Sequence, residues 1–392
     1  MDKIYFDHAA TTAVRPEVLD AILPFFTERY GNPSSIYEIA RTNKKALETA
    51  RDKTAAALGA DPAEIFFTGS GTEADNWAIR GIAELNEKTG GHIITTAIEH
   101  HAVLHTCQYL EKHGFSVTYL PVGGDGIISM ADLEKAIRPD TKLITVMTAN
   151  NEIGSLQPIE EIGALARSKK IVFHTDAVQA VGQIPINVKA QNIDMLSLSA
   201  HKFYGPKGVG ALYVKKGIPL RPFMFGGAQE RGKRAGTENI PGIVGLGAAI
   251  ELAAFEMDKE SKRLAVLRDR LIEGVLSSDS HVRLNGSRTK RLPNNVNVSF
   301  EFVEGESMLL LLDMKGIFAS SGSACTSGSL DPSHVLLAIG LPHEKAHGSL
   351  RLTLGRDTTD EQIDYFLKEL PPIIARLRDM SPLYEEYLKL KK

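Results

Sequence analysis

Cysteine is almost absent from this chain, which has only Cys107 and Cys325 among its 392 residues. Two widely separated cysteines supply neither a disulfide framework nor a CxxC metal pattern, so a reducing cytoplasm is the expected compartment. An excess of one charge is also absent: the net charge is −3, with both signs mixed along the chain. The sequence therefore gives no basis for binding nucleic acid or an anionic membrane.

Long hydrophobic runs are missing as well. Residues 1–7 have no apolar core behind a basic start, so a secretory signal is not expected. The longest apolar stretch, residues 240–255, contains Glu251 and is too short to span a bilayer. With 43% hydrophobic and 24% charged residues the composition is that of an ordinary globular protein, and the length favours two domains.

Short apolar runs alternate with helical stretches between about residues 60 and 214. The runs are residues 65–67, 93–94, 117–120, 143–147, 171–173, 195–198 and 211–214. Unbroken apolar strands separated by helices indicate an α/β fold with a mainly parallel, seven-stranded sheet between helices. Ligands bind beyond the carboxyl ends of such strands, so the chemistry is expected there.

The composition of the sequence and the pattern of expected elements change after about residue 256. A charged amphipathic segment leads to an alternating strand at residues 295–300, a helix, a Ser/Gly-rich loop, a strand at 350–354 and a final helical region. This pattern predicts a smaller α+β domain. We expect a large cofactor-binding domain at residues 15–257, and a small domain made of residues 1–14 and 258–392 that carries the Cys325 loop.

The segment from Phe67 to Asn76 contains a strand end, a glycine turn and a helix start. Glycines such as Gly71 let the backbone approach a ligand, and a helix N-terminus offers free N–H groups to a phosphate. The segment lacks the spacing of a P-loop or a dinucleotide fingerprint. Phosphate binding and a plain turn with a Thr cap remain two interpretations of this segment taken alone.

Two further segments place a charged residue just past an apolar strand. Asp176 is either a capping or ion-paired acid, or the partner of a protonated ring nitrogen, as in pyridoxal-phosphate (PLP) enzymes. Lys202, with Ser199 and His201 nearby, is a candidate for Schiff-base formation, because burial lowers the pKa of a lysine amine. A phosphate turn, a ring acid and a reactive lysine in this order are far more specific than any one of them.

Histidine and cysteine supply the remaining candidates. His100 and His101 are adjacent, so we expect only one of them to face the site and stack on a flat ring. Cys325 lies among serines and glycines, which predicts an exposed, mobile and reactive thiol that does not rest against Lys202 before substrate arrives. Cys107 lies in an apolar helical stretch and is expected to be inert core.

With these segments in hand, the chain resembles the NifS/IscS-type cysteine desulfurases, which are class V aminotransferase-like PLP enzymes of fold type I. The resemblance covers nearly the whole chain, and the form of residues 234–239 is closer to the NifS branch. Its marks are Tyr-Phe-Asp-His-Ala-Ala-Thr-Thr at residues 5–12, Gly-Asn-Pro-Ser-Ser at 31–35, Gly-Thr-Glu at 71–73, Ala-Asn-Asn-Glu-Ile-Gly at 149–154, the Asp176 and Lys202 segments, Glu-Arg-Gly at 230–232, Arg-Ala-Gly-Thr at 234–237 and the serine-rich cysteine loop.

The resemblance implies a role for each matching residue. Lys202 attaches to PLP, His100 stacks on its ring, Asp176 pairs with the ring nitrogen and Gln179 bonds the ring oxygen. The residues implied to hold the phosphate are Gly71, Thr72, Ser199 and His201, with Thr237 reaching over from the second subunit of a homodimer. Asn151 and Arg351 are implied to grip the substrate carboxylate, for which the planar fork of arginine is suited.

The resemblance also implies the reaction. L-cysteine displaces Lys202 from the cofactor, the freed amine removes the α-proton, and the Cys325 thiolate attacks the substrate sulfur. A persulfide forms on Cys325, L-alanine leaves, and the sulfur passes to an Fe–S scaffold protein or another acceptor. No metal site is expected; Fe–S cluster ligation through the Cys325 persulfide is expected only on a scaffold complex.

Two other classes of function compete with this hypothesis. An aminotransferase or a selenocysteine lyase would share every PLP residue, but a transaminase has no use for Cys325. A PLP-fold binding module without catalysis is the other alternative, and the presence of Lys202 and Asp176 argues against it.

Overall fold

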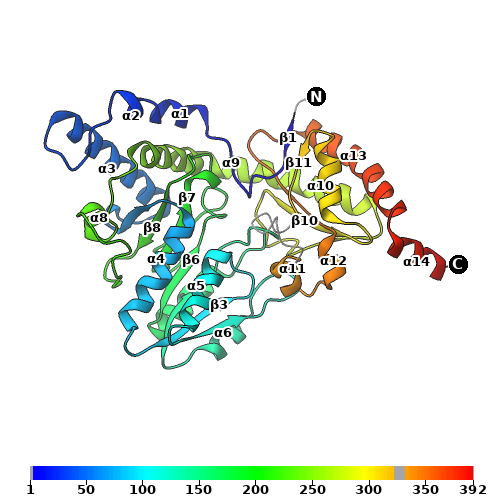
Figure 1. Cartoon of the computed structure of the whole chain (residues 1–392), viewed down its shortest axis with the longest axis horizontal. Coiled ribbons are helices and arrows are strands. Elements are labelled where there is room, and N and C mark those ends of the chain that lie inside the picture. Colours follow the sequence, from blue (N-terminus) through cyan, green and yellow to red (C-terminus); the bar gives the residue numbers. More distant parts are fainter. Residues whose placement is uncertain (1–2, 322–331, 392) are drawn as a thin grey trace.

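A seven-stranded sheet forms the centre of the larger lobe in the computed structural model, which describes residues 3–321 and 332–391 (Figure 1). The strand order is β2-β8-β7-β6-β5-β3-β4. Only β8 is antiparallel to its neighbours, so the prediction of a mainly parallel sheet is confirmed. The strands are β2 (Ile65–Thr68), β3 (Gly91–Thr96), β4 (Phe115–Leu120), β5 (Thr141–Thr145), β6 (Val172–Asp176), β7 (Met195–Ser199) and β8 (Gly210–Val214).

Helices cover both faces of this sheet because successive side chains of each strand point to opposite sides. On β7, for example, Leu196 and Leu198 belong to one hydrophobic core and Met195 belongs to another. The first core includes side chains of α3 (Glu38–Leu58), α7 (Ile159–Lys169) and α9 (Ile240–Ser278), and the second includes α4 (Gly71–Ala83) and α5 (His101–Glu111). The other helices of this lobe are α1 (Pro16–Ile22), α2 (Pro24–Thr27), α6 (Met130–Ala136) and α8 (Gln229–Gly232).

The smaller lobe combines an antiparallel sheet with helices, as predicted. Its three strands, in the order β12-β10-β9, are β12 (Ser349–Thr353), β10 (Asn295–Phe300) and β9 (Val282–Leu284). The N-terminal segment joins this lobe, since β1 (Ile4–Tyr5) pairs in parallel with β11 (Ile317–Phe318). Its helices are α10 (Gly305–Asp313), α11 (His334–Ala338), α12 (His343–His347), α13 (Asp360–Asp379) and α14 (Pro382–Leu390).

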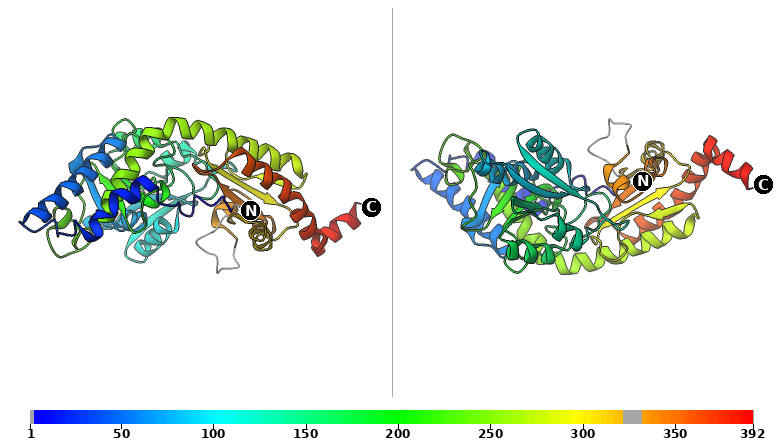
Figure 2. Two further views of the ribbon diagram at one scale, coloured as in Figure 1. Left: turned by 90° about the horizontal axis from the view of Figure 1, so that it is seen from above. Right: turned by 90° about the horizontal axis from the view of Figure 1, so that it is seen from below.

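Helix α9 is 39 residues long and runs along both lobes (Figure 2). The predicted boundary between residues 257 and 258 therefore lies inside a continuous helix. Leu246 near its start is buried in the core of the large sheet, and Leu271 near its end is buried in the core of the small lobe. The apolar stretch at residues 240–255 is thus part of a longer element. By length and composition alone this helix is able to cross a membrane, but here its buried apolar side chains belong to two protein cores.

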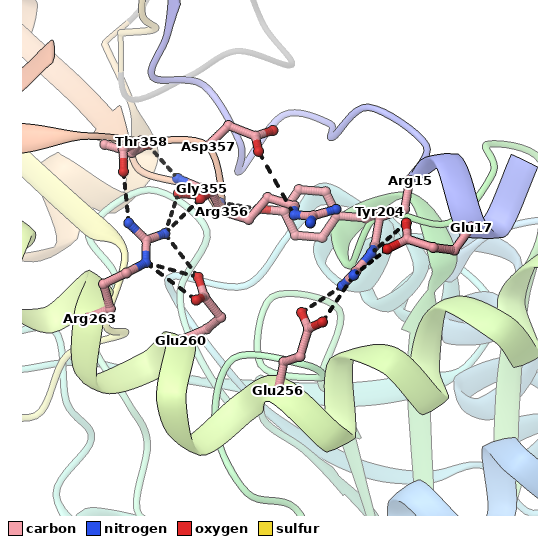
Figure 3. A network of polar contacts seen from close by, with 10 residues as sticks. All are labelled: Arg15, Glu17, Tyr204, Glu256, Glu260, Arg263, Gly355, Arg356, Asp357 and Thr358. Carbon is pink, nitrogen blue, oxygen red and sulfur yellow. Dashed lines mark hydrogen bonds and ion pairs between the residues drawn. The ribbon is translucent and has the colours of Figure 1, made fainter.

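A network of hydrogen bonds and ion pairs links the two lobes beside α9 (Figure 3). Arg15 donates to both carboxylate oxygens of Glu256 at 2.6 and 3.0 Å. Tyr204, two residues after Lys202, accepts a hydrogen bond at its hydroxyl from the backbone N–H of Arg356 at 2.8 Å. Arg263 donates to three backbone carbonyls of the loop after β12, those of Gly355, Arg356 and Thr358. The lysine turn of the large lobe is therefore tied to the strand that carries Arg351.

Candidate active site

A cavity of about 380 Å³ lies beyond the carboxyl ends of the large sheet. Segments that follow β2, β3, β5, β6 and β7 contribute to its wall, as expected for a parallel sheet. Arg351 of β12 and the N-terminal residues Ala9 and Ala10 complete it from the small lobe. The predicted residues that line it are Gly71, Thr72, His100, Asn151, Asp176, Gln179, Ser199, His201, Lys202 and Arg351.

The glycine turn brings the start of α4 against the cavity. Ser70 caps this helix, because its hydroxyl accepts a hydrogen bond from Glu73 N at 3.1 Å. The cap is thus a serine and not a threonine. Gly71 has no room for a side chain, since an added Cβ would lie 2.6 Å from Val178 Cγ2 and 3.4 Å from Ser199 Cβ. The close approach lets the free N–H groups of the first helical turn face an anion.

Two buried aspartates line the cavity. Asp176, at the end of β6, is 5% exposed and accepts a hydrogen bond from Val178 N at 2.9 Å. Burial raises the pKa of Asp176 to about 6. Asp75 of α4 is 1% exposed, and burial together with the charge of Asp176 raises its pKa well above the ordinary range. A cationic group bound next to Asp176 would stabilise the ionised form of its carboxylate.

The lysine turn contacts the N-terminal segment. Lys202 ends a short turn after β7, and its Nζ donates to the carbonyl oxygens of Ala9 at 2.5 Å and Ala10 at 2.8 Å. Gln179 Nε2 donates to the same Ala9 oxygen at 3.0 Å. His201 Nδ1 forms a hydrogen bond with the Thr11 hydroxyl at 3.1 Å. The backbone oxygens of Ala9 and Ala10 and the hydroxyl of Thr11 therefore position three of the predicted cofactor residues.

His100 occupies the N-cap position of α5. Its Nδ1 accepts a hydrogen bond from Ala102 N at 3.1 Å, which places the ring proton on Nε2. Burial, helped by the charge of Lys202, lowers the pKa of His100 to about 4, so the ring is neutral at pH 7. The prediction that only one of the two adjacent histidines faces the site is wrong. His101 also lines the cavity, with the ring of His334 centred 4.8 Å from its own.

Arg351 is 2% exposed and is held by two partners. Its Nη2 donates to Asp7 Oδ1 at 2.8 Å, and its Nη1 donates to the backbone oxygen of Asn151 at 3.1 Å. Its Nε is buried without a hydrogen-bond partner among the described residues. Because a buried unsatisfied donor is costly, this guanidinium is suited to receive an anion.

The comparisons with known proteins agree with one another. The aminotransferase class-V family matches residues 4–366. A cysteine desulfurase IscS of Clostridium botulinum (strain Hall) is 60% identical over 100% of this chain and 99% of its own length. A cysteine desulfurase IscS of Methanosarcina thermophila is 61% identical over 97% of this chain and 94% of its own length. The chain belongs to the cysteine desulfurases of the class-V aminotransferase family.

Solved structures of similar proteins support this membership. A NifS-like protein has a TM-score of 0.90 and 41% identity, covering 95% of this chain and 100% of that one. SspA in complex with cysteine has a TM-score of 0.79 and 40% identity, covering 90% of this chain and 98% of that one. The predicted family and fold class are confirmed. Because the relatives carry both the IscS and the NifS names, the NifS branch stays a prediction.

Cysteine desulfurases of this family depend on PLP, which confirms the predicted cofactor. The cavity of this member fits that group. Gly71 lets the start of α4 pack against Val178 and Ser199, where a Cβ would not fit, and this helix start is suited to a phosphate. Asp176 offers a buried carboxylate to a protonated ring nitrogen. Asp75, which also lines the cavity, has a buried Oδ1 with no hydrogen-bond partner among the described residues. Lys202 reaches the same space.

The remaining predicted residues are Thr237 and Cys325. Thr237 is exposed and does not line it, so its predicted contact with the phosphate of a second subunit stays a prediction. Cys325 lies outside the described residues, and so does the predicted position of its loop. Cys107 of α5 is 0% exposed in a hydrophobic core, and burial raises its pKa, which agrees with the expected inert role.

Several functional positions were missed by the sequence reasoning. Asp7, Ala9 and Ala10 belong to a segment that the family resemblance marks, but nothing local in it points to contacts with Arg351 or Lys202. Glu152 belongs to the Ala-Asn-Asn-Glu-Ile-Gly motif, which by itself indicates no role for this side chain. Its carboxylate accepts a hydrogen bond from the Ser333 hydroxyl, and burial raises its pKa to about 7.

Proposed function

We propose that this protein converts L-cysteine to L-alanine, with Lys202 and Arg351 at the substrate and Cys325 as the sulfur acceptor. One observation carries the proposal. A single cavity holds a lysine, a buried acid and a buried arginine from segments that are far apart in the sequence. This set matches the needs of an enzyme that acts on the α-carbon of an amino acid.

Arg351 and Asn151 orient the substrate. The guanidinium fork binds the α-carboxylate with charge-assisted hydrogen bonds, and its 2% exposure keeps water from competing. The bond from Arg351 Nη1 to the Asn151 backbone fixes the plane of the fork. A fixed carboxylate leaves the α-carbon and the thiol of the substrate in defined places, which lowers the entropic part of the barrier.

Lys202 moves the proton. PLP, when bound, supplies an electron sink for the α-carbon, and Asp176 supports it by keeping the ring nitrogen protonated. The Lys202 amine takes the proton from the α-carbon of the substrate. His100, which is neutral at pH 7, presents an uncharged ring to the cavity and adds no positive charge that would compete with Arg351 for the carboxylate.

Cys325 accepts the sulfur. Its thiolate attacks the sulfur of the substrate, so an S–S bond forms while the substrate C–S bond breaks. The electron pair of the broken bond stays with the β-carbon, which takes up a proton and becomes the methyl group of L-alanine. The persulfide on Cys325 then delivers sulfur to an Fe–S scaffold protein or another acceptor.

We also propose a cytoplasmic homodimer in which Thr237 of each subunit reaches the phosphate site of its partner. This arrangement is supported by the position of Thr237, which is exposed and does not line the cavity of its own subunit. Sedimentation of the active enzyme measures the assembly state, and an active monomer would contradict the dimer.

The roles are tested with two variants assayed against L-cysteine. Lys202→Ala should be folded and lose turnover, and a fully active Lys202→Ala would contradict the assignment. Cys325→Ala should bind PLP and L-cysteine but lose sulfide release and persulfide labelling. A transaminase that merely resembles a desulfurase would keep full activity in this second variant.

A further inference from the structure

We propose that Asp7 sets the affinity of the site for amino-acid carboxylates by competing for Arg351. This inference rests on the proposed function, in which Arg351 binds the α-carboxylate. It concerns a residue of the N-terminal segment that does not line the cavity. Asp7 acts behind the arginine, on the group that holds the substrate.

The contacts of Arg351 define the competition. An arginine side chain carries five N–H donors, and here one bond goes to Asp7 Oδ1 at 2.8 Å and one to the Asn151 backbone oxygen at 3.1 Å. Nε has no hydrogen-bond partner among the described residues. A substrate carboxylate therefore still finds donors on Arg351, but it meets a guanidinium that already has an anion beside it.

The charge of this pair is the physical basis of the proposal. Arg351 is 2% exposed and the Asp7 side chain is 19% exposed, so water screens their attraction only in part. With Asp7 present, the anchor is neutral overall before substrate enters. A second carboxylate gains the attraction of Arg351 and is repelled by Asp7, so it binds less tightly than it would to the arginine alone.

Weak binding is useful in this reaction because substrate and product share the anchored group. L-alanine differs from L-cysteine only by the sulfur atom, so the contacts that hold the carboxylate hold both. A stronger anchor would stabilise both complexes equally and slow the departure of alanine without helping the chemical step. Asp7 limits that uniform binding.

The backbone around Asp7 is fixed independently of its carboxylate. Phe6 N donates to the Phe318 oxygen at 2.8 Å, and Ala9 N donates to the Thr353 hydroxyl at 2.8 Å. Asp7→Asn keeps the shape and one acceptor oxygen, so it removes the charge with little change in packing. Asp7→Ser provides a second uncharged variant with a smaller polar side chain.

The experiment measures the dissociation constant of L-alanine for the PLP-loaded enzyme from the absorbance change of the cofactor. Ethylamine, which is alanine without its carboxylate, is titrated in parallel. The control variant is Asp357→Asn, which removes a negative charge from an 86% exposed side chain in the loop after β12. Circular dichroism of each variant establishes that it is folded.

We expect Asp7→Asn and Asp7→Ser to bind L-alanine about tenfold more tightly than the wild type, a change of about 1.4 kcal/mol. The KM for L-cysteine should fall by a similar factor, whereas ethylamine binding and the Asp357→Asn variant should match the wild type. Equal or weaker alanine binding by the folded Asp7 variants would overturn the inference. So would an equal gain for ethylamine, since that gain would not depend on the carboxylate.

Arg351→Leu separates this inference from the proposed function. If Arg351→Leu loses alanine binding while the Asp7 variants equal the wild type, Arg351 is the anchor and only the role of Asp7 is wrong. If Arg351→Leu binds alanine as tightly as the wild type, the assigned substrate anchor is wrong and the Asp7 inference falls with it.

Discussion

Glu99, directly before the candidate ring-stacking histidine, allows a quantitative test of the electrostatics under the cavity. Its side chain is fully buried, and its carboxylate accepts hydrogen bonds from the Thr96 hydroxyl at 2.8 Å and from Met147 N at 3.0 Å. Burial outweighs these bonds and raises the pKa of Glu99 from 4.5 to about 8. At neutral pH the side chain is therefore protonated in the folded protein and ionised in the unfolded chain.

The sign of the effect follows from the proton count. The folded state binds a proton that the unfolded chain has released, so stability falls as pH rises between 4.5 and about 8. At 1.36 kcal/mol per pH unit, the gap between the two pKa values sets an upper bound of about 5 kcal/mol. Glu99→Gln mimics the protonated side chain and removes this titration. Between about pH 5 and pH 8 the free energy of unfolding of the wild type should fall by up to about 4 kcal/mol more than that of the variant.

Urea unfolding followed by circular dichroism at about pH 5, 6.5 and 8 measures this difference. Glu87→Gln is the matched control, since Glu87 is exposed and the same chemical change there should leave the pH dependence of the wild type intact. Parallel pH profiles for the wild type and Glu99→Gln would mean that Glu99 is ionised in the folded protein, and the electrostatic reasoning would be refuted.

Three further substitutions test the fold and the cofactor site. Glu230→Gln breaks a buried ion pair with Arg51 at 2.9 Å. We expect the free energy of unfolding, measured by urea titration, to fall by about 3–5 kcal/mol, and an unchanged midpoint would contradict this. Gly71→Ala places a Cβ 2.6 Å from Val178 Cγ2, and because overpacking costs about 1–3 kcal/mol, PLP affinity in a fluorescence titration should fall about tenfold to a hundredfold. Native affinity would mean that the close packing of Gly71 against Val178 is not needed for PLP binding. Asp176→Asn keeps the shape and removes the charge, so activity should fall by orders of magnitude, while unchanged activity and spectra would make the residue merely structural.

The large sheet could be predicted because its signals are local. Each apolar run forms a strand in the sheet, and the chemistry follows the strand ends at Gly71, Asp176 and Lys202. The continuity of α9 was missed for a physical reason. The helix leaves one core and enters another, so its composition changes from Gly/Ala-rich to charged around residue 256 while the backbone stays helical.

The contacts around Arg351 could not be predicted from the sequence. Arg351 and Asp7 are 344 residues apart, and no local pattern in either segment indicates the other. The sequence predicts that only one of His100 and His101 faces the site, because two adjacent side chains point in different directions. In the structure His100 is the N-cap of α5 and His101 is its first residue, and both residues line the cavity.

The central claim is tested most directly by incubating the purified protein with PLP, L-cysteine and a thiol reductant, and measuring sulfide and L-alanine in the same sample. The account predicts that the two products appear in equal amounts, and that both disappear in Lys202→Ala. Alanine without sulfide, sulfide without alanine, or neither product from folded, PLP-loaded wild-type protein would contradict it.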